Sequence, residues 1–485
     1  MAGIYTTPGV HIEEIDALPE PLSAVPTSIP AFIGYTQKTG DEESDLTLQA
    51  VRIDSLPDFE CHFGSGPEPI LSFVPVPVPA DGLAQPTVIM GGESYALQRS
   101  SPAWHLYRAV ALYFLNGGGA CYIVSVGQFT DGPDHVALLG GVSCLETEHD
   151  IGLVVVPDAV ALPTLADCVT VQQAVLAHCA EHANRFAILD VYEGYRSRAE
   201  GRDCVAMFRG ALGINHLRDG AAYYPWLCAN LPAASAPGYR HLDSRSRQLL
   251  TDGIAGELGI PVAHDSATED IDQRFRSLST LYREFLHQAR ELVSLVPPSG
   301  AIAGVYVSVD KQRGVWKAPA NISVNGIIRP SVSISNDDQQ DLNVTSQGKS
   351  INAIRAFAGR GILVWGGRTL DGNNAEWRYI SVRRTAGMIE ASIQAGLEAF
   401  AFLPNNARTW DTVKSRIDAF LLQLWSEGGI MGARAEEAFF VRLGLGQTMT
   451  EQDMQQGRLR VHVGVALMRP AEFVVINLSL QMVRD

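Results

Sequence analysis

The glycine-rich stretch 116–122 (NGGGACY) is the part of this sequence most suggestive of chemistry, because a glycine-rich loop can surround phosphate oxygens with backbone amides. A Walker loop requires a lysine and a serine or threonine after its glycines, and neither follows here. The dinucleotide-binding pattern requires a further glycine at position 122, where Tyr122 stands. The stretch therefore favours a tight turn before a strand.

Asp190, at the end of a predicted strand, could belong to a Ser-His-Asp triad of a hydrolase. No G-x-S-x-G motif places a serine nucleophile on a sharp turn, however. His178 and His182 stand four residues apart on a predicted helix, a spacing that can hold a metal ion, but no third ligand accompanies them. The adjacent glutamates 13–14 and 436–437 indicate solvated faces. We predict no catalytic residue, no metal site and no cofactor.

Both ends of the chain carry short alternating segments. After Pro8 and Gly9, apolar and polar residues alternate in VHIEE, and the segment FVVINLSLQM after Pro470 is similarly strand-like. Neither segment has a hairpin partner beside it in the sequence. An unpaired strand exposes backbone donors and acceptors, so it tends to complete another sheet.

Helices and apolar strands alternate between these ends. We expect strands at 29–36, 121–127, 150–159 and 185–194, and helices at 103–119, 171–184, 278–296 and 409–427. Continuous apolar strands separated by helices predict an α/β unit with a largely parallel, buried sheet. Alternating prolines in 73–82 exclude a central strand there, so 64–100 is interpreted as an extended surface insertion. Residues 351–485 look like a separate α+β unit.

Composition narrows the class further. With 485 residues, 46% of them hydrophobic and 19% charged, the chain is an ordered multidomain protein. The net charge of −16 argues against a nucleic-acid binder. This charge is uneven, at −19 for residues 1–346 and +3 for 347–485. No secretory signal or membrane-spanning run is visible, and the seven cysteines lack C-x-x-C spacing, which predicts buried reduced thiols.

Several stretches, taken together and in order, resemble the contractile sheath proteins of phage tails, R-type bacteriocins and extracellular contractile injection systems. They are TPGVHIEEI, VPTSIPAFIGYT, FLNGGGACYIVSVG, DGAAYYPWL, PPSGAIAGVYVSVDKQRGVWKAPAN, INAIRAFAGRGILVWGGRT, WRYISVRRT, WSEGGIMG and VVINLSLQM. His11 departs from the aromatic residue usual in the opening motif, and the proline-rich region 64–100 fits the family least.

The resemblance implies an α/β and α+β multidomain fold. A core α+β domain would be built from the N-terminal strand region and the C-terminal segment, with an inserted α/β outer domain and strand-like extensions at both termini. We therefore expect an N-terminal linking arm at 1–22, an outer and middle α/β region at 23–346, a core sheath domain facing the tube at 347–470, and a C-terminal linking strand at 471–485.

The resemblance also implies the function of a structural subunit that polymerises helically around an inner tube and contracts to drive it through a target membrane. The expected partners are further copies of the chain, the tube protein, and baseplate and terminal cap proteins, with no nucleic acid and no membrane insertion. Assembly in the bacterial cytoplasm into a phage tail-like particle is expected. The alternatives are an α/β hydrolase-like enzyme and a soluble binding module.

On this hypothesis the terminal strands add to sheets of neighbouring subunits. The linking residues are expected to be Val10, Ile12 and Ile15 in the first strand, and Val474, Ile476, Leu478 and Leu480 in the second. Pro8, Gly9 and Pro470 are expected to act as hinges. Lys414 and Arg416, on the helix predicted at 409–427, are candidates for contact with an acidic tube, although ordinary solvated charges explain them equally well.

Overall fold

The computed structural model describes residues 22–41, 44–76, 87–198, 202–231, 237–259, 269–345 and 348–472. The chain divides into two compact units, each made from two separate stretches. The small unit comprises Met1–Ala24 and Ser392–Ala466, and the large unit comprises Val25–Ala391 and Leu467–Asp485. The linking residues predicted at 10–15 and 474–480, and the hinge at 8–9, lie outside the described residues.

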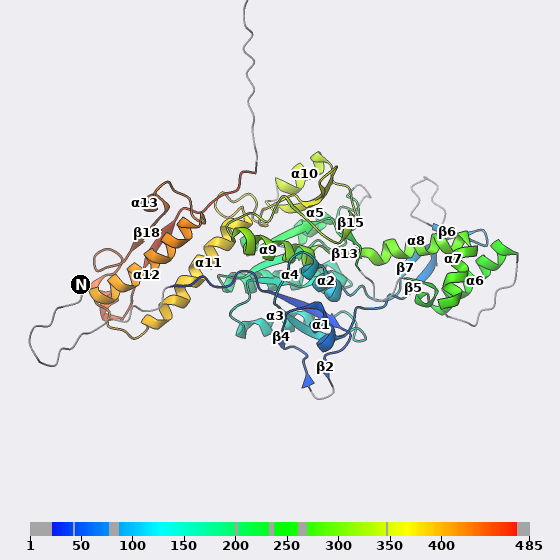
Figure 1. Ribbon diagram of the computed structural model, residues 1–485, viewed down its shortest axis with the longest axis horizontal. Helices are drawn as coiled ribbons and strands as arrows, with labels where there is room; N and C mark the ends of the chain where they lie inside the picture. Colours follow the sequence, from blue (N-terminus) through cyan, green and yellow to red (C-terminus); the bar gives the residue numbers. More distant parts are fainter. Residues whose placement is uncertain are drawn as a thin grey trace, which may run out of the picture. The chain divides into compact units, whose positions relative to one another are not determined.

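A nine-stranded sheet forms the centre of the large unit (Figure 1). Its strand order is β14-β17-β16-β11-β10-β9-β1-β8-β4. The six strands from β16 to β8 run parallel, and the outer strands are antiparallel to their neighbours. The predicted parallel, buried sheet is thus confirmed. The bounds are β1 (Pro30–Thr36), β4 (Ala50–Ile53), β8 (Cys121–Gln128), β9 (Leu153–Val155), β10 (Phe186–Asp190), β11 (Gly220–Tyr224), β14 (Ile322–Ser323), β16 (Ile351–Phe357) and β17 (Gly361–Val364).

Helices cover both faces of this sheet, because its strands send apolar side chains alternately to either side. In β1, Ile33 joins the core under α3 (His135–Ser143), α4 (Leu165–Glu181) and α5 (Cys204–Ala211). Its neighbour Phe32 joins the core under α1 (Leu56–Phe63), α2 (Leu106–Leu115) and α9 (Ser299–Arg313). Of the helices in the described ranges, none is long and apolar enough to cross a membrane.

The division between the units differs from the boundary that we predicted at residue 347. Strand β16 pairs in parallel with β11, Ile351 lying opposite Ala222, so residues 351–364 complete the sheet of the large unit. The division falls instead within α11 (Ile380–Leu397). Just before this helix, Arg368 and Tyr379 form an isolated bridge.

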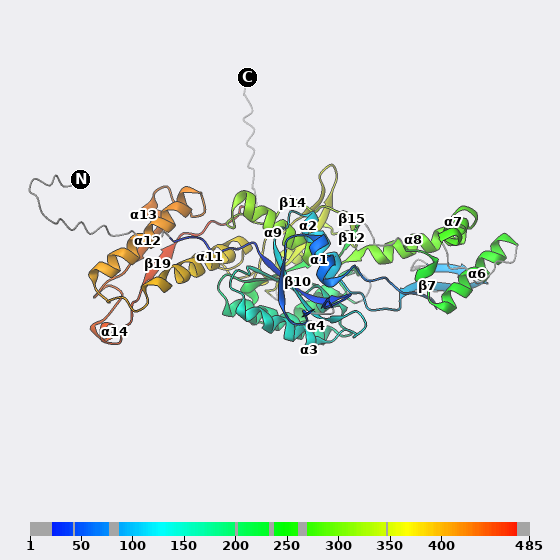
Figure 2. The same cartoon turned by 60° about the horizontal axis from the view of Figure 1, so that its bottom comes forward.

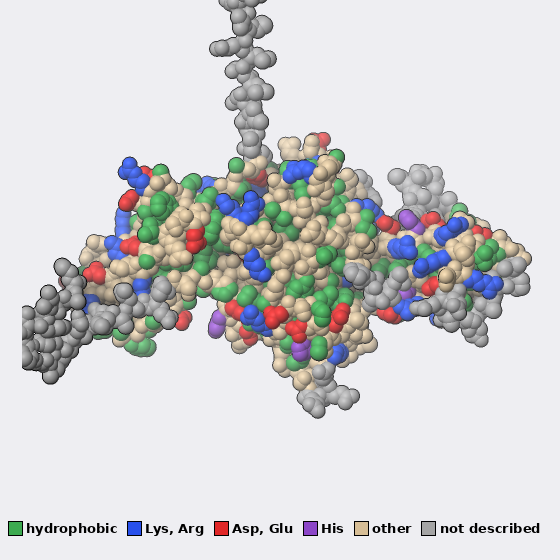
Figure 3. Space-filling view, viewed as in Figure 1, with side chains coloured by type: hydrophobic (Ala, Val, Ile, Leu, Met, Phe, Trp, Pro, Cys, Tyr) green, Lys and Arg blue, Asp and Glu red, His purple; other side chains and the backbone are tan. Residues whose placement is uncertain are grey.

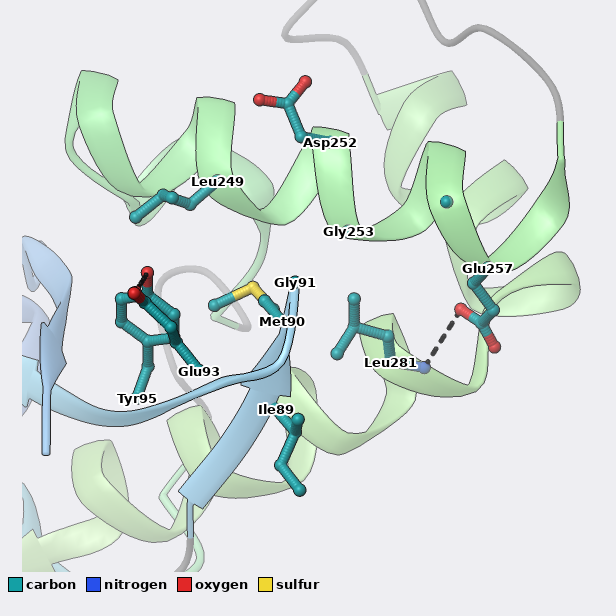
Figure 4. A pocket seen from close by; sticks show the side chains of 11 residues that line it. Ile89, Met90, Gly91, Glu93, Tyr95, Leu249, Asp252, Gly253, Glu257 and Leu281 are labelled. Carbon is teal, nitrogen blue, oxygen red and sulfur yellow. Dashed lines mark hydrogen bonds between the residues drawn. The ribbon is translucent and has the colours of Figure 1, made fainter. Parts of the chain in front are cut away.

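The described part of the proline-rich region forms a sheet, where we expected an extended insertion. It contributes β5 (Leu71–Pro75), β6 (Thr87–Met90) and β7 (Glu93–Arg99), a sheet in which Pro75 ends an edge strand, as proline requires. Helices α6 (Ser244–Leu258), α7 (Glu269–Leu278) and α8 (Thr280–Ser294) pack on this sheet around Phe73 and Phe285. A cavity of about 540 Å³ lies beside the β6–β7 turn (Figure 4). At its edge Glu257 of α6 accepts a hydrogen bond from the Leu281 amide at 3.3 Å, which holds the start of α8.

The small unit is built on α12 (Ala407–Ser426) and a two-stranded sheet of β18 (Phe439–Arg442) and β19 (His462–Val465). The predicted apolar face of α12 is confirmed, since it buries Val413, Ile417, Phe420, Leu421 and Leu424. The helix begins at Asn406, whose side chain accepts from the Thr409 amide. Short helices α13 (Ala435–Ala438) and α14 (Glu451–Gln455) complete the described part. Strand β19 pairs with β18, and the strand-like segment predicted after Pro470 lies outside the described residues from 473 onward.

Candidate assembly surfaces

The glycine stretch 116–122 is a turn, as the sequence favoured. Gly117 has a φ of 93°, and the Gly118 amide donates to the Tyr113 carbonyl at 3.0 Å. The Gly119 amide donates to the Tyr113 hydroxyl at 3.0 Å. The amides that a phosphate would need are therefore already bonded within the protein.

Asp190 holds the end of β10 to the start of α9. Its carboxylate accepts from the Ser299 hydroxyl at 2.5 Å and from the Ser299 amide at 2.9 Å. Burial raises the pKa of Asp190 to about 7, although both bonds from Ser299 favour the charged form. The carboxylate is buried and engaged at a helix start, which is a structural arrangement and does not resemble a hydrolase triad.

His178, on α4, contacts an arginine, and His182 follows the last residue of this helix. The His178 Nε2 atom is bonded to the Arg185 guanidinium, and the His182 Nδ1 atom lies 3.0 Å from the His178 carbonyl oxygen. Burial, and then the charge of Arg185, lower the pKa of His178 to about 4. The positive guanidinium next to this ring nitrogen disfavours both protonation of His178 and binding of a metal ion there. In the part of the chain that the structure describes, no three His, Cys, Asp or Glu side chains are grouped to hold a metal.

The cysteines are free thiols. Five of them are buried, as predicted, whereas Cys61 is exposed and Cys144 is partly exposed. Burial raises the pKa of the Cys204 thiol to about 11, so this group stays protonated and unreactive at neutral pH.

The β18–β19 sheet offers strand edges in the small unit. Phe440 lies opposite Gly464, and Val441 opposite Val463. The Ala466 amide donates to the Ala438 carbonyl at 2.8 Å, so the alternation of an antiparallel ladder turns the amides of Val441 and Val463 outward. No other described strand pairs with either edge. Such a sheet can accept a further strand on each side.

The first described residue of the N-terminal segment is seated on α11. Leu22 is buried, and it lies so close to Gly396 that a Cβ at Gly396 would overlap with its side chain. Any side chain at position 396 would displace Leu22. This contact fixes the position of Leu22 on α11.

The C-terminal segment is held by four side chains that we call the Glu472 clamp. Glu472 accepts from Arg368 in a bidentate pair at 2.6 and 2.8 Å, from Asn343 at 2.8 Å and from Tyr379 at 3.1 Å. The Arg368 side chain is only 3% exposed. Burial would raise the pKa of Glu472, but the bonds from Arg368 and Asn343 outweigh it, so that the pKa lies below its usual range. Glu472 is therefore charged at neutral pH.

The sequence missed this clamp. The predicted hinge Pro470 lies two residues before Glu472, which is the last described residue before the predicted linking strand. The only sequence feature that pointed to the clamp was a single carboxylate, Glu472, between Pro470 and the apolar segment that follows. Its partner Arg368 is 104 residues away, and no local pattern joins the two.

The two tube-contact candidates on α12 differ in their surroundings. Lys414 is exposed, whereas Arg416 is half-buried and lies over the Phe400 ring, 4.9 Å from its centroid. The Arg416 Nε atom is buried and has no hydrogen-bond partner among the described residues. Lys414 is thus the more accessible charge for a partner.

Large apolar side chains are exposed on the small unit, and Figure 3 shows hydrophobic surface over α13 and β18. The exposed set is Phe402, Leu403, Leu422, Met431, Phe440 and Leu445. Phe402 is fully exposed and has a φ of 67°, a conformation that is costly for an aromatic residue. A strained, solvent-exposed phenylalanine is best explained by contact with a partner.

Replacing Phe402 with glycine should separate stability from assembly. Glycine adopts a positive φ freely, so the free energy of unfolding should stay equal or rise by up to about 1 kcal/mol. Self-assembly should weaken, because the exposed ring is lost. Thermal unfolding and sedimentation measure the two effects. Phe402→Leu, which keeps an apolar side chain, is the control; an F402G protein that assembles at the wild-type concentration would show that this ring is not a contact.

Comparisons with known proteins agree with one another. Residues 373–481 match the family model of the phage tail sheath C-terminal domain. A tail sheath protein of Vibrio phage KVP40 is 28% identical over 142 residues, and a putative prophage major tail sheath protein of Pseudomonas aeruginosa is 26% identical over 139 residues. These matches cover 29% and 28% of this chain, but only 21% and 35% of the two relatives.

Solved structures extend the similarity to the whole chain. The sheath of the PVC extracellular contractile injection system, in its contracted state, is 26% identical with a TM-score of 0.63, and the match covers 99% of this chain and 98% of that one. The contracted helical sheath of the anti-feeding prophage is 29% identical with a TM-score of 0.63, over 98% and 99% of the two chains.

The open strand edges, the contacts of Leu22 and Glu472 and the exposed apolar side chains are candidate surfaces for contact with other chains. The comparisons specify the resemblance: residues 373–481 match the phage tail sheath C-terminal domain, and the whole chain is similar to the subunits of contractile sheaths. The resemblance inferred from the sequence is confirmed.

Proposed function

We propose that this chain is the structural subunit of a contractile sheath, which polymerises helically around an inner tube and contracts to drive the tube through a target membrane. The observation that carries the proposal is the full-length similarity to two contracted sheaths. The alternatives of a hydrolase and a soluble binding module have no support, because Asp190 caps a helix and the relatives are structural sheath proteins.

Strand exchange would connect the subunits. Val10, Ile12 and Ile15 of one neighbour, and Val474, Ile476, Leu478 and Leu480 of another, would add to the open edges of β18 and β19. Such head-to-tail contacts propagate a helix and do not close a dimer. Leu22 and the Glu472 clamp would fix where each strand leaves its own subunit.

Contraction would be a rigid-body rotation of subunits that remain joined by these strands. Pro8, Gly9 and Pro470 would absorb the change of angle. The extended state would be a kinetically trapped, high-energy assembly, and new contacts in the short state would release a few kcal/mol per subunit, an order of magnitude typical of interfaces. No nucleotide is required, in agreement with the glycine turn whose amides are bonded internally.

Lys414 is proposed to contact the tube. Lys414→Glu should lower the affinity for purified tube by about five- to tenfold at low salt, because it replaces an attraction with a repulsion. The difference should shrink at high salt. Lys317→Glu makes the same charge change at another exposed lysine and should bind the tube normally. Co-sedimentation measures both; equal binding by the two variants would exclude Lys414 from the contact.

The remaining partners follow from the same proposal. Baseplate and terminal cap proteins would bind the two ends of the polymer, and assembly would take place in the bacterial cytoplasm, with the finished particle free or cell-anchored. The chain would have no enzymatic activity, and it would contact neither nucleic acid nor lipid directly.

Negative-stain electron microscopy of the purified full chain tests the proposal. Hollow, striated tubes are expected, either from the chain alone or on addition of the tube protein. A protein that stays monomeric at every concentration, with and without the tube protein, would contradict it.

A further inference from the structure

A cavity of about 590 Å³ lies in the large unit at the carboxyl ends of parallel strands. Its walls come from the end of β7, from the segment before α2, from the segments that follow β9, β10 and β11, and from the junction of α8 with β13 (Leu295–Val296). Parallel α/β sheets bind ligands outside the carboxyl ends of their strands, and pockets of 300–1,000 Å³ suit small molecules. Neither the strand exchange nor the tube contact proposed above uses this cavity.

The cavity is cationic at one end. Arg99 lines it, and the Arg99 Nε atom is buried without a hydrogen-bond partner among the described residues. Arg108 is close enough that, after burial, its charge contributes to lowering the pKa of Arg99 to about 9. Arg108 donates to the Val293 carbonyl, and no described carboxylate pairs with either arginine. Two neighbouring guanidinium groups without a counter-charge are unfavourable, and an anion would relieve this.

His105 adds a second polar group without a partner. Its side chain is 1% exposed, and neither ring nitrogen has a hydrogen-bond partner among the described residues. Burial, and then Arg99 and Arg108, hold the pKa of His105 well below its usual value, so the ring is neutral at pH 7. A buried imidazole normally forms at least one hydrogen bond. Its position beside Arg99 in the wall of the cavity adds a donor for an anion that reaches it.

Aromatic side chains line the cavity next to His105. The Trp226 ring meets the His105 and Tyr195 rings with centroids 5.3 Å apart in each case, and Arg196 lies over Tyr195 at 5.4 Å. Among the described residues that line the cavity, Glu193 is the only carboxylate, and it is already paired with Arg196 at 3.3 Å. The free positive charge is thus at Arg99, next to a flat apolar surface.

We propose that this cavity binds a small molecule that joins an oxyanion, phosphate or carboxylate, to a flat aromatic body, with Arg99 and His105 at the oxyanion and Trp226 and Tyr195 along the ring. Arginine pairs with such oxyanions in a bidentate geometry, which gives short, strong hydrogen bonds. The sheath function does not depend on this site, and binding can be measured whether or not the chain polymerises.

Isothermal titration of the full chain with phenyl phosphate, phenylacetate, inorganic phosphate and benzyl alcohol tests the proposal. The first two probes should bind, inorganic phosphate should bind more weakly, and the neutral alcohol should not bind measurably. Arg99→Gln should lower the affinity for phenyl phosphate by about ten- to a hundredfold, as expected for one lost charge-assisted bond. Arg240→Gln, at an exposed arginine outside the cavity, is the matched control and should bind as wild type.

A second variant keeps the Arg99 charge and fills the cavity. Ala103 lines the cavity and is partly exposed, so Ala103→Phe should block binding while thermal unfolding shows that the subunit is folded. Absence of binding by any probe at millimolar concentration would overturn the proposal. So would equal affinities of the R99Q and R240Q proteins, or undiminished binding by a folded A103F protein.

Discussion

Removal of residues 473–485 should abolish polymerisation and leave a folded subunit. The truncated chain keeps all four residues of the Glu472 clamp, so the nine-stranded sheet and its two cores lose none of their described contacts. The strand that is lost would bury four apolar side chains in a neighbour, each contributing about 1.5–3 kcal/mol. The concentration required for assembly should therefore rise by roughly a thousandfold or more. Sedimentation velocity and electron microscopy measure assembly, and circular dichroism measures folding.

Single substitutions on opposite faces of that strand provide a matched comparison. Ile476→Asp places a charge on the face proposed to enter the neighbour, and it should prevent assembly nearly as well as the truncation does. Asn477→Asp makes a similar change one position later, on the opposite face of a strand, and it should assemble normally. Tubes of normal length from the truncated or the I476D protein would show that this segment is not the connector.

The parallel sheet could be predicted because its signal is local. Strands such as β8 and β10 are continuous apolar runs, and α12 buries residues at three- and four-residue spacing. The order of the strands could not be predicted in the same way. Strand β16 joins β11 across the 126 residues of intervening sequence, 225–350, and this pairing moved the boundary between the two units from residue 347 to residue 391.

The assembly surfaces were predictable only in part. The alternating pattern identified both terminal strands as candidates, and the spacing in α12 identified its solvent-facing positions. The spacing in α12 could not distinguish Lys414 from Arg416, because only the folded turn before α12 brings Phe400 under the Arg416 guanidinium. The cavity at Arg99 also has no sequence signal, since its walls come from six separate segments.

Glu472→Gln should destabilise the large unit by about 3 kcal/mol, because it leaves the buried Arg368 charge without its counter-charge. The glutamine amide would also turn a donor toward the donors of Arg368 or Tyr379. Assembly of the E472Q protein should also weaken. If the clamp fixes where the linking strand leaves the subunit, its loss disperses that strand over a larger volume and lowers its effective concentration at the neighbour.

We therefore expect the E472Q protein to melt at a lower temperature and to require about tenfold more protein for assembly. Glu376→Gln makes the same change at a nearby exposed glutamate and should match wild type in both measurements. The pH dependence distinguishes the clamp from a general loss of stability. Since the pKa of Glu472 is lowered on folding, its contribution is present above its usual value of 4.5 and is lost as the pH falls below it. The difference between wild type and E472Q should accordingly shrink below pH 4.5; a difference that persists unchanged there would assign the effect to packing and not to the ion pair.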